Sequence, residues 1–319
     1  MKNFIYKSIL AVSCIYLYSG YANAACVQNP RLSNIQKTIP DETINIQYDD
    51  TRSYQLKAIS LPIYRGTYNP TNGVDYNCGG NQVGIYLAPV SNGMAVSGIN
   101  GIGVKVRIDS FGPNTFFPIN GPYIETTWRF TDVSWDIRIE KTGRVPSGGI
   151  ISTRQLARFY QQNRKTGTNF IISTVSFSTN YRINVLSCSL KNSVPTINLG
   201  DWYDTQFPSV GSTSTNINIP ITLNCMAGTN IKATVTSSKY EDTATGKLGL
   251  TGPDSATGIA IQLLDKNNNP IKLNTLNSLQ NNVPAGDYIF NWKARYIKTA
   301  DNITPGTANA SATVNIRYE

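Results

Sequence analysis

The sequence predicts an all-β protein built from two sandwich domains. Short apolar alternations recur along the chain, and clusters of Gly, Pro, Asn and Ser separate them. No segment holds a convincing helical period of 3.6 residues. Removal of a 24-residue leader would leave 319 − 24 = 295 residues, a length that fits two domains better than one.

The chain begins with a segment typical of a secretory signal. Lys2 and Lys7 form a short basic region before an apolar stretch that runs from about residue 8 to 21. Residues 22–24 (Ala-Asn-Ala) then supply the small side chains of a cleavage site. The apolar stretch is shorter than the roughly 20 residues that a membrane span needs. We therefore expect cleavage after Ala24 and export of a soluble mature protein.

The clearest strands of the first half lie at 104–108 and 135–139. In both, apolar residues alternate with charged ones, which is typical of a strand with one buried and one solvated face. The segment 152–163 fits either a short helical turn or an outward-curving strand. Further strands are expected over 83–87, 126–130, 170–177 and 181–186.

Four cysteines remain after the leader, which carries Cys14, has been removed: Cys26, Cys78, Cys188 and Cys225. An even number in an exported chain favours disulfides over free thiols or metal ligands. Four cysteines allow three different pairings.

The positive charge of the chain is concentrated in its first part. Residues 25–187 hold 16 Lys plus Arg against 10 Asp plus Glu, a net charge of +6, whereas residues 188–319 hold 10 against 9, a net charge of +1. Nucleic acid is not expected as a partner of an exported β protein. Acidic glycans or an anionic cell surface are better candidates, and an evenly solvated basic surface fits equally well.

The residues needed for common catalytic sites are missing. The chain has no histidine, which excludes Ser/His and Cys/His catalysis and removes the commonest metal ligand. Gly79, Gly80 and Gly84 are spaced wrongly for a phosphate loop. Asp132 and Asp136 could form a glycosidase pair, but Asp136 alternates with strand residues and is expected to face solvent. We expect no enzymatic activity, no cofactor and no metal.

The last fourteen residues, GTANASATVNIRYE, predict a strand that runs to the end of the sequence. Val314, Ile316 and Tyr318 alternate with polar residues, the period of a strand that buries one face. Left unpaired, such a strand would be an edge prone to aggregation.

Two regions resemble pilus subunits assembled by the chaperone–usher pathway. Gly306 is fourteenth from the end and Tyr318 is penultimate, a pairing similar to the C-terminal signature of those subunits. The segment 188–225 resembles the opening of a pilin domain, since two cysteines bracket a Leu-Gly step at 199–200 and an alternating strand at 217–223. The resemblance covers residues 188–319.

The resemblance implies a fold, disulfides and partners. Both domains would be immunoglobulin-like sandwiches, with the pairs Cys26–Cys78 and Cys188–Cys225. The pilin sandwich would lack its final strand. A periplasmic chaperone would fill the vacant position temporarily, and the donor strand of the next pilus subunit would fill it permanently after passage through an outer-membrane usher. The contact with chaperone and donor strand would involve Val314, Ile316 and Tyr318.

The domain order resembles that of a fimbrial tip adhesin. The segments 101–106 and 139–148 resemble segments in the receptor-binding domains of such adhesins, and similar segments also occur in ordinary pilin sandwiches. The implied layout is a signal peptide over 1–24, a receptor-binding domain over 25–187 and a pilin domain over 188–319. The protein would lie at the fimbrium tip on the cell surface and bind a host glycan or glycoprotein. The alternatives are a minor structural or capping subunit and an adhesin for a matrix protein such as collagen.

Two groups of residues are candidates for receptor binding. The loop around Cys78 combines an aromatic ring with carboxylate and amide groups that suit a sugar, although the same residues could simply pack beside the disulfide and shape turns. A basic segment would suit sialylated or sulfated glycans. The loop candidates are Asp75, Tyr76, Asn77 and Asn81, and the basic candidates are Arg154, Arg158, Arg164 and Lys165.

Overall fold

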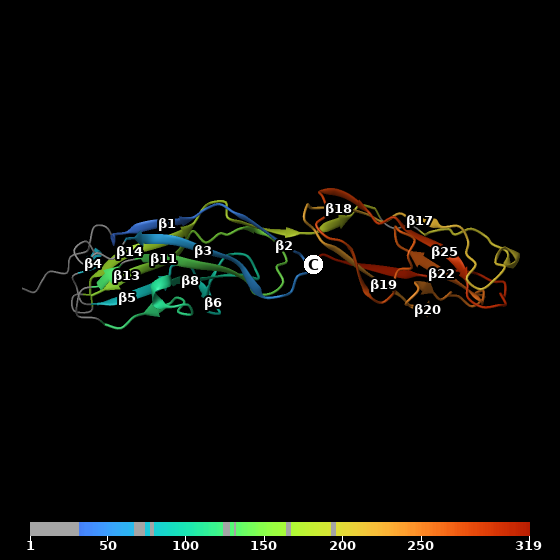
Figure 1. Ribbon diagram of the computed structural model, residues 1–319, viewed down its shortest axis with the longest axis horizontal. Helices are drawn as coiled ribbons and strands as arrows, with labels where there is room; N and C mark the ends of the chain where they lie inside the picture. The colour runs from blue at the N-terminus through green and yellow to red at the C-terminus, as the bar shows by residue number, and fades with distance from the viewer. Residues whose placement is uncertain are drawn as a thin grey trace, which may run out of the picture.

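The computed structural model describes residues 32–66, 74–76, 80–123, 128–130, 132–163, 167–192 and 196–319, with the backbone alone at 74–76 and 128–130. These residues form the predicted all-β protein. Its strands build two lobes that lie end to end, and the C-terminus lies at the junction between them (Figure 1). Helical structure among the described residues is limited to Leu32 and two short 3₁₀ turns, η2 (Asp109–Phe111) and η3 (Asp204–Gln206).

Two five-stranded sheets form most of the first lobe. Along strands such as 102–108 and 132–141, buried apolar residues largely alternate with more exposed ones. Each sheet therefore has one face toward the core and one toward solvent. The first sheet has the order β1 (Ile35–Ile39), β14 (Asn169–Phe177), β13 (Gln155–Gln162), β5 (Asn81–Tyr86), β9 (Ile119–Asn120). The second has the order β3 (Tyr54–Arg65), β11 (Asp132–Lys141), β8 (Ile102–Ile108), β7 (Met94–Val96), β6 (Val90–Ser91).

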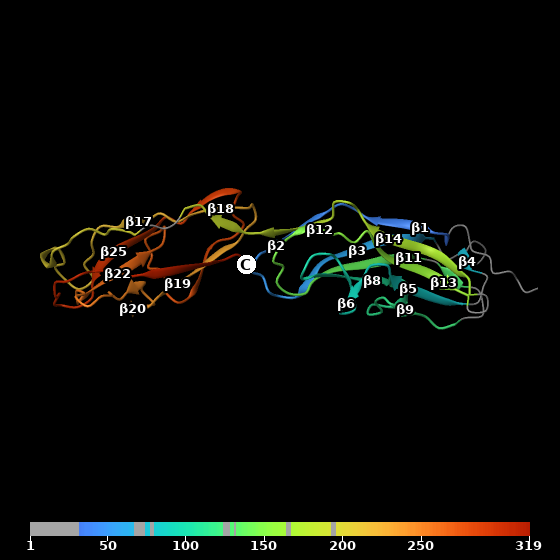
Figure 2. The ribbon, with the colours of Figure 1, turned by 180° about the vertical axis from the view of Figure 1, so that it is seen from behind.

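Smaller sheets complete this lobe. One has the order β12 (Gly149–Ile150), β15 (Arg182–Leu186), β2 (Thr43–Gln47). The rear view shows β2 and β12 at the end of the lobe nearest the junction (Figure 2). The other pairs β10 (Trp128–Phe130) with β4 (Val74–Tyr76).

The second lobe contains three sheets. The first has the order β16 (Cys188–Leu190), β18 (Thr222–Cys225), β24 (Gly286–Ile289). The second has the order β17 (Ile217–Ile219), β25 (Trp292–Lys298), β22 (Ile259–Leu264), β21 (Lys247–Leu248), β20 (Tyr240–Asp242). The third has the order β23 (Leu276–Gln280), β19 (Ile231–Ser237), β26 (Ala312–Arg317).

Each lobe has its own hydrophobic core. The buried cluster of the first lobe runs from Leu32 to Ile183 and is centred on Trp135, whose indole N–H donates to the Ser173 hydroxyl at 2.9 Å. The buried cluster of the second lobe runs from Leu199 to Ala294. Since apolar burial is the main favourable contribution to folding, each lobe has the core that an independent unit requires.

The strands predicted from strict alternation are present, and the ambiguous segment 152–163 is resolved. Residues 155–162 form β13, which lies between β14 and β5 and pairs with both, so the helical alternative is wrong. Asp136 alternates with the buried residues of β11, as the sequence predicts, but it is not freely solvated. Its side chain is 17% exposed and accepts a hydrogen bond from Arg107 Nε at 2.6 Å, because the register of β11 with β8 places these two residues opposite each other.

The predicted signal segment 1–24, Cys26 and Cys78 lie outside the described residues. In the part of the chain that the structure describes, no helix is long and apolar enough to cross a membrane.

Candidate functional site

The terminal strand β26 lies at the edge of its sheet. It pairs antiparallel with β19 from Ala312 to Arg317, and among the described residues no strand pairs with its other side. The backbone groups on that side form an edge to which a further strand could be added. The sequence prediction of a terminal strand is therefore confirmed.

The inward face of β26 is only partly covered. Val314, Ile316 and Tyr318 pack against the core of the second lobe but remain half-buried. Their cross-strand partners on β19 differ, since Val235 opposite Val314 and Ala233 opposite Ile316 have no exposed surface. The exposure therefore arises on the unpaired side of β26.

An inward-facing residue of another strand, β16, is also exposed. Leu190 of β16 stands opposite Leu223 of β18, so both side chains point to the same face of their sheet. Leu223 is fully buried, yet Leu190 is 52% exposed. An apolar residue on an inner face normally finds a partner there, so both β16 and β26 present apolar surface that this chain leaves uncovered.

Tyr318, which follows β26, forms a hydrogen bond to β16 at the junction end of the second lobe. Its hydroxyl donates to the carbonyl oxygen of Cys188 at 3.0 Å. Burial raises the pKa of Tyr318, so the phenol stays protonated and can donate at neutral pH. Cys188 forms a disulfide with Cys225, the pairing that the resemblance implies.

Gly306 owes its place in the signature to a close approach of two backbone segments. A Cβ on this residue would lie 2.5 Å from the carbonyl oxygen of Asp254 and 2.6 Å from the nitrogen of Ala256. The neighbouring Thr307 is bonded to the same segment, donating from its N–H to Asp254 at 2.7 Å and accepting from Ala256 at 2.9 Å. Any side chain at 306 would push these strands apart.

The first lobe contacts the end of β26. The N–H of Asp49 donates to the carbonyl of Tyr318 at 2.9 Å, and the N–H of Tyr318 donates to the Asp49 carboxylate at 3.0 Å. Gln47 donates to the carbonyl of Gly228 at 2.9 Å and accepts from the N–H of Asn230 at 3.0 Å. The last residues of the terminal strand therefore lie against the loop that follows β2.

A buried lysine fixes that loop. Lys141 Nζ donates to the carbonyls of Asp50 at 2.5 Å, Gly143 at 2.6 Å and Arg52 at 2.7 Å, and its side chain is fully buried. Arg52 also donates two hydrogen bonds to the Asp50 carboxylate, which hold the pKa of Asp50 well below its usual range. Burial lowers the pKa of Lys141.

The receptor candidates near Cys78 are placed only in part. Asp75 and Tyr76 belong to β4, where they pair with Arg129 and Trp128 of β10, and Asn77 lies outside the described residues. Asn81 is fully buried and donates to the side chain of Asn120. It is the first residue of β5 and lies beneath the surface.

Of the basic candidates that the structure describes, Arg154 comes just before β13 and Arg158 lies within it. Arg154 is exposed and Arg158 is half-buried, whereas Arg164 and Lys165 lie outside the described residues. These placements leave both receptor hypotheses as predictions.

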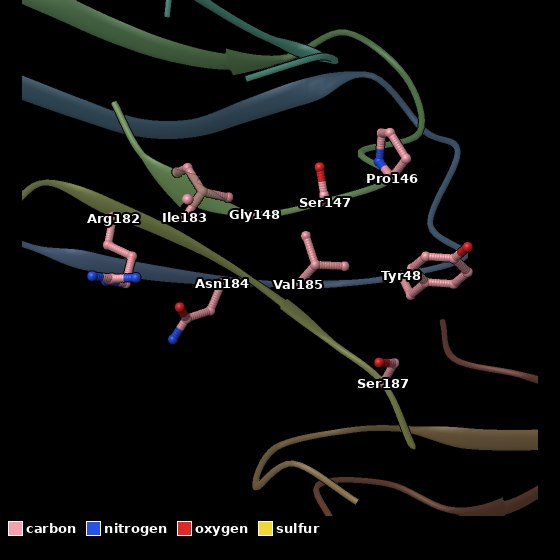
Figure 3. A pocket seen from close by; sticks show the side chains of 10 residues that line it. Tyr48, Pro146, Ser147, Gly148, Arg182, Ile183, Asn184, Val185 and Ser187 are labelled. Carbon is pink, nitrogen blue, oxygen red and sulfur yellow. The ribbon is translucent and has the colours of Figure 1, made fainter. Parts of the chain in front are cut away.

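The structure also contains a cavity that sequence reasoning did not identify. It is open to solvent and has a volume of about 310 Å³ at the junction end of the first lobe (Figure 3). Tyr48, the turn 146–149, the strand residues 182–185 and Ser187 line it. Three distant segments meet here, and the only local signal in the sequence was the turn at Ser147-Gly148-Gly149.

Comparison with known proteins identifies similar sequences. Residues 175–319 match the family model "Fimbrial protein". The type-1 fimbrial protein A chain of Salmonella typhi is 30% identical over 152 residues, which cover 46% of this chain and 82% of the relative. The fimbrial-like protein YdeS of Escherichia coli K12 is 34% identical over 120 residues, which cover 36% of this chain and 68% of the relative.

Among solved structures, the CupB6 tip adhesin of Pseudomonas aeruginosa is similar over 89% of this chain and 93% of its own. The sequence identity is 16% and the TM-score is 0.38.

Proposed function

The chain belongs to the fimbrial protein family, and from this premise we propose that it is a two-domain tip adhesin. Residues 25–187 would bind a host receptor, and residues 188–319 would anchor the protein to the pilus. The separation of the two hydrophobic cores supports a boundary between Ser187 and Cys188. The family match from 175 to 319 leaves most of the first lobe as an addition to a fimbrial subunit, which is the layout expected of an adhesin.

The observation that carries the proposal is the unpaired edge of β26 beside uncovered apolar side chains. We propose that an extended segment of another protein adds to this edge. Backbone hydrogen bonds would give affinity, and alternate apolar side chains would contact Leu190, Val314 and Ile316. The periplasmic chaperone would be the first occupant and the donor strand of the next subunit the second, with the usher mediating the exchange.

The domain order supports the tip position, because a further lobe precedes the part of the chain that matches the fimbrial family. A tip subunit accepts a donor strand and needs to give none, so a receptor-binding lobe can stand before the pilin domain. Export to the cell surface would follow from assembly into a fimbrium.

The adhesin role is tested by exposing the full mature chain to a glycan array and a panel of matrix proteins. We expect the chain to bind a glycan on the array. Bacteria expressing the chain should adhere to cells bearing that glycan, and bacteria lacking it should not. Unchanged adhesion after deletion, with pilus assembly impaired instead, would favour a structural or capping subunit.

A further inference from the structure

We propose that the junction cavity of the first lobe binds a saccharide that carries an acidic group. This inference rests on the proposed receptor-binding role and deepens it by naming a site and a ligand class. The cavity volume of about 310 Å³ lies at the lower end of the range for small-molecule sites and suits one or two sugar rings.

One backbone edge in the cavity has no partner. In β15 the N–H of Arg182 donates to Glu42 at 2.7 Å, and the carbonyl of Leu186 accepts from Tyr48 at 3.1 Å, so the even residues direct their backbone groups toward β2. The odd residues therefore direct theirs to the opposite side, because backbone direction alternates along a strand.

Two of these odd-numbered residues have backbone hydrogen-bond partners on that side, and one has none. Ile183 pairs with Gly149 of β12, and the carbonyl of Ser187 accepts from the N–H of Met226 at 3.2 Å. Among the described residues nothing pairs with the N–H and C=O of Val185, which lies between them and lines the cavity. Val185 is half-buried, and a half-buried backbone donor and acceptor without protein partners are available to a polar ligand.

The length of this open edge favours a sugar over a peptide. Gly148 closes one end, since a Cβ on it would lie 2.3 Å from the carbonyl of Ile183. Met226 of the second lobe closes the other end through Ser187. An added strand needs several consecutive open residues, whereas adjacent sugar hydroxyls can donate to and accept from a single residue.

The side chains around the cavity offer polar groups and carry no negative charge. Ser147 and Ser187 offer hydroxyls, Asn184 an amide, and Tyr48 an aromatic ring, while no carboxylate lines the space. Figure 3 shows Arg182 and Asn184 directed to one side of β15 and Ile183 and Val185 to the other, with Tyr48 at the end of the cavity.

The guanidinium of Arg182 is the cation available to an acidic ligand. The Arg182 side chain is exposed, and no acceptor among the described residues pairs with it. The neighbouring Arg144 differs, because it stacks on Tyr48 at 4.4 Å and donates to Asp49 at 3.2 Å. A free arginine on the same side of β15 as the Asn184 amide matches a sugar carboxylate.

The test uses the full mature chain in calorimetric titrations with three probes: sialyllactose, a hexuronic acid oligosaccharide, and neutral lactose. We expect one of the two acidic probes to bind, with lactose weaker by about tenfold or more. Raising the salt concentration should weaken the binding. The acidic probe that binds identifies the source of the carboxylate.

Matched variants locate the site. Arg182→Ala and Ser147→Trp should each weaken binding by about tenfold, whereas Arg65→Ala and Ser60→Trp, which change exposed residues that do not line the cavity, should alter it by less than about twofold. Circular dichroism confirms that each variant is folded. The amide proton of Val185 should exchange rapidly in the free protein and slowly with ligand bound.

Four results would overturn the proposal: absence of binding to either acidic probe, equal binding of lactose, equal effects of Arg182→Ala and Arg65→Ala, or unchanged exchange at Val185. These measurements need no pilus. Their failure therefore leaves the adhesin role open, while failure of adhesion with intact saccharide binding would contradict the adhesin role alone.

Discussion

At the scale of single residues, Tyr318 contributes to stability both through its ring and through its hydroxyl. Its ring packs on the second core and its hydroxyl donates to Cys188. Tyr318→Phe keeps the ring and leaves the carbonyl of Cys188 without this donor, so unfolding of the second lobe should require about 1 kcal/mol less free energy. Urea denaturation measures the change. Tyr203→Phe, at an exposed tyrosine, is the control and should have no effect.

Asp50 predicts how stability depends on pH. Because hydrogen bonds from Arg52 lower its pKa in the folded state, Asp50 contributes stability that is complete above the unfolded pKa near 3.8 and is lost as pH falls toward the folded pKa. Thermal melts between pH 6 and pH 2 should show the first lobe losing stability below about pH 4. Asp50→Asn should be less stable at pH 6 and show a flatter profile. A profile as steep as that of the unmodified chain would contradict this assignment.

At the scale of elements, Gly306 shows how the terminal segment depends on contact with the chain around Asp254. Gly306→Ala should destabilise the second lobe by about 1–3 kcal/mol, because a methyl group cannot fit between the two backbones without moving them. Asn309→Ala, at an exposed residue three positions further along, should change stability by less than about 0.5 kcal/mol. Equal effects in a denaturant titration would mean that the close approach is not maintained.

The elements also show what sequence patterns can and cannot predict. The strands at 104–108 and 135–139 follow strict alternation and are present. The segment 152–163 was ambiguous because a bulge between Gln155 and Ala157 places two buried residues side by side, which breaks the period of two. The pairing of Asp136 with Arg107 and the cavity at Val185 depend on register between distant strands, and no local pattern encodes register.

At the scale of the whole molecule, the two cores predict two separable unfolding units. Trp135→Ala removes a fully buried ring from the first core and should destabilise that lobe by about 3–5 kcal/mol. Trp292→Ala should do the same to the second lobe. Calorimetry should show one transition shifted in each variant and the other little changed. A single transition that moves equally in both variants would mean that the lobes unfold as one unit.

Completion of the second lobe by a strand from another protein is the central claim, and a thermal melt of the full mature chain with a synthetic donor peptide tests it most directly. The peptide carries apolar residues at alternate positions, and a control peptide of the same composition places them consecutively. The alternating peptide should raise the melting temperature of the second lobe, with a stabilisation of about 2.7 kcal/mol at a hundredfold excess over its dissociation constant. Amide exchange should slow at Val314 and Ile316. A monomeric chain whose melting temperature ignores both peptides would contradict the claim.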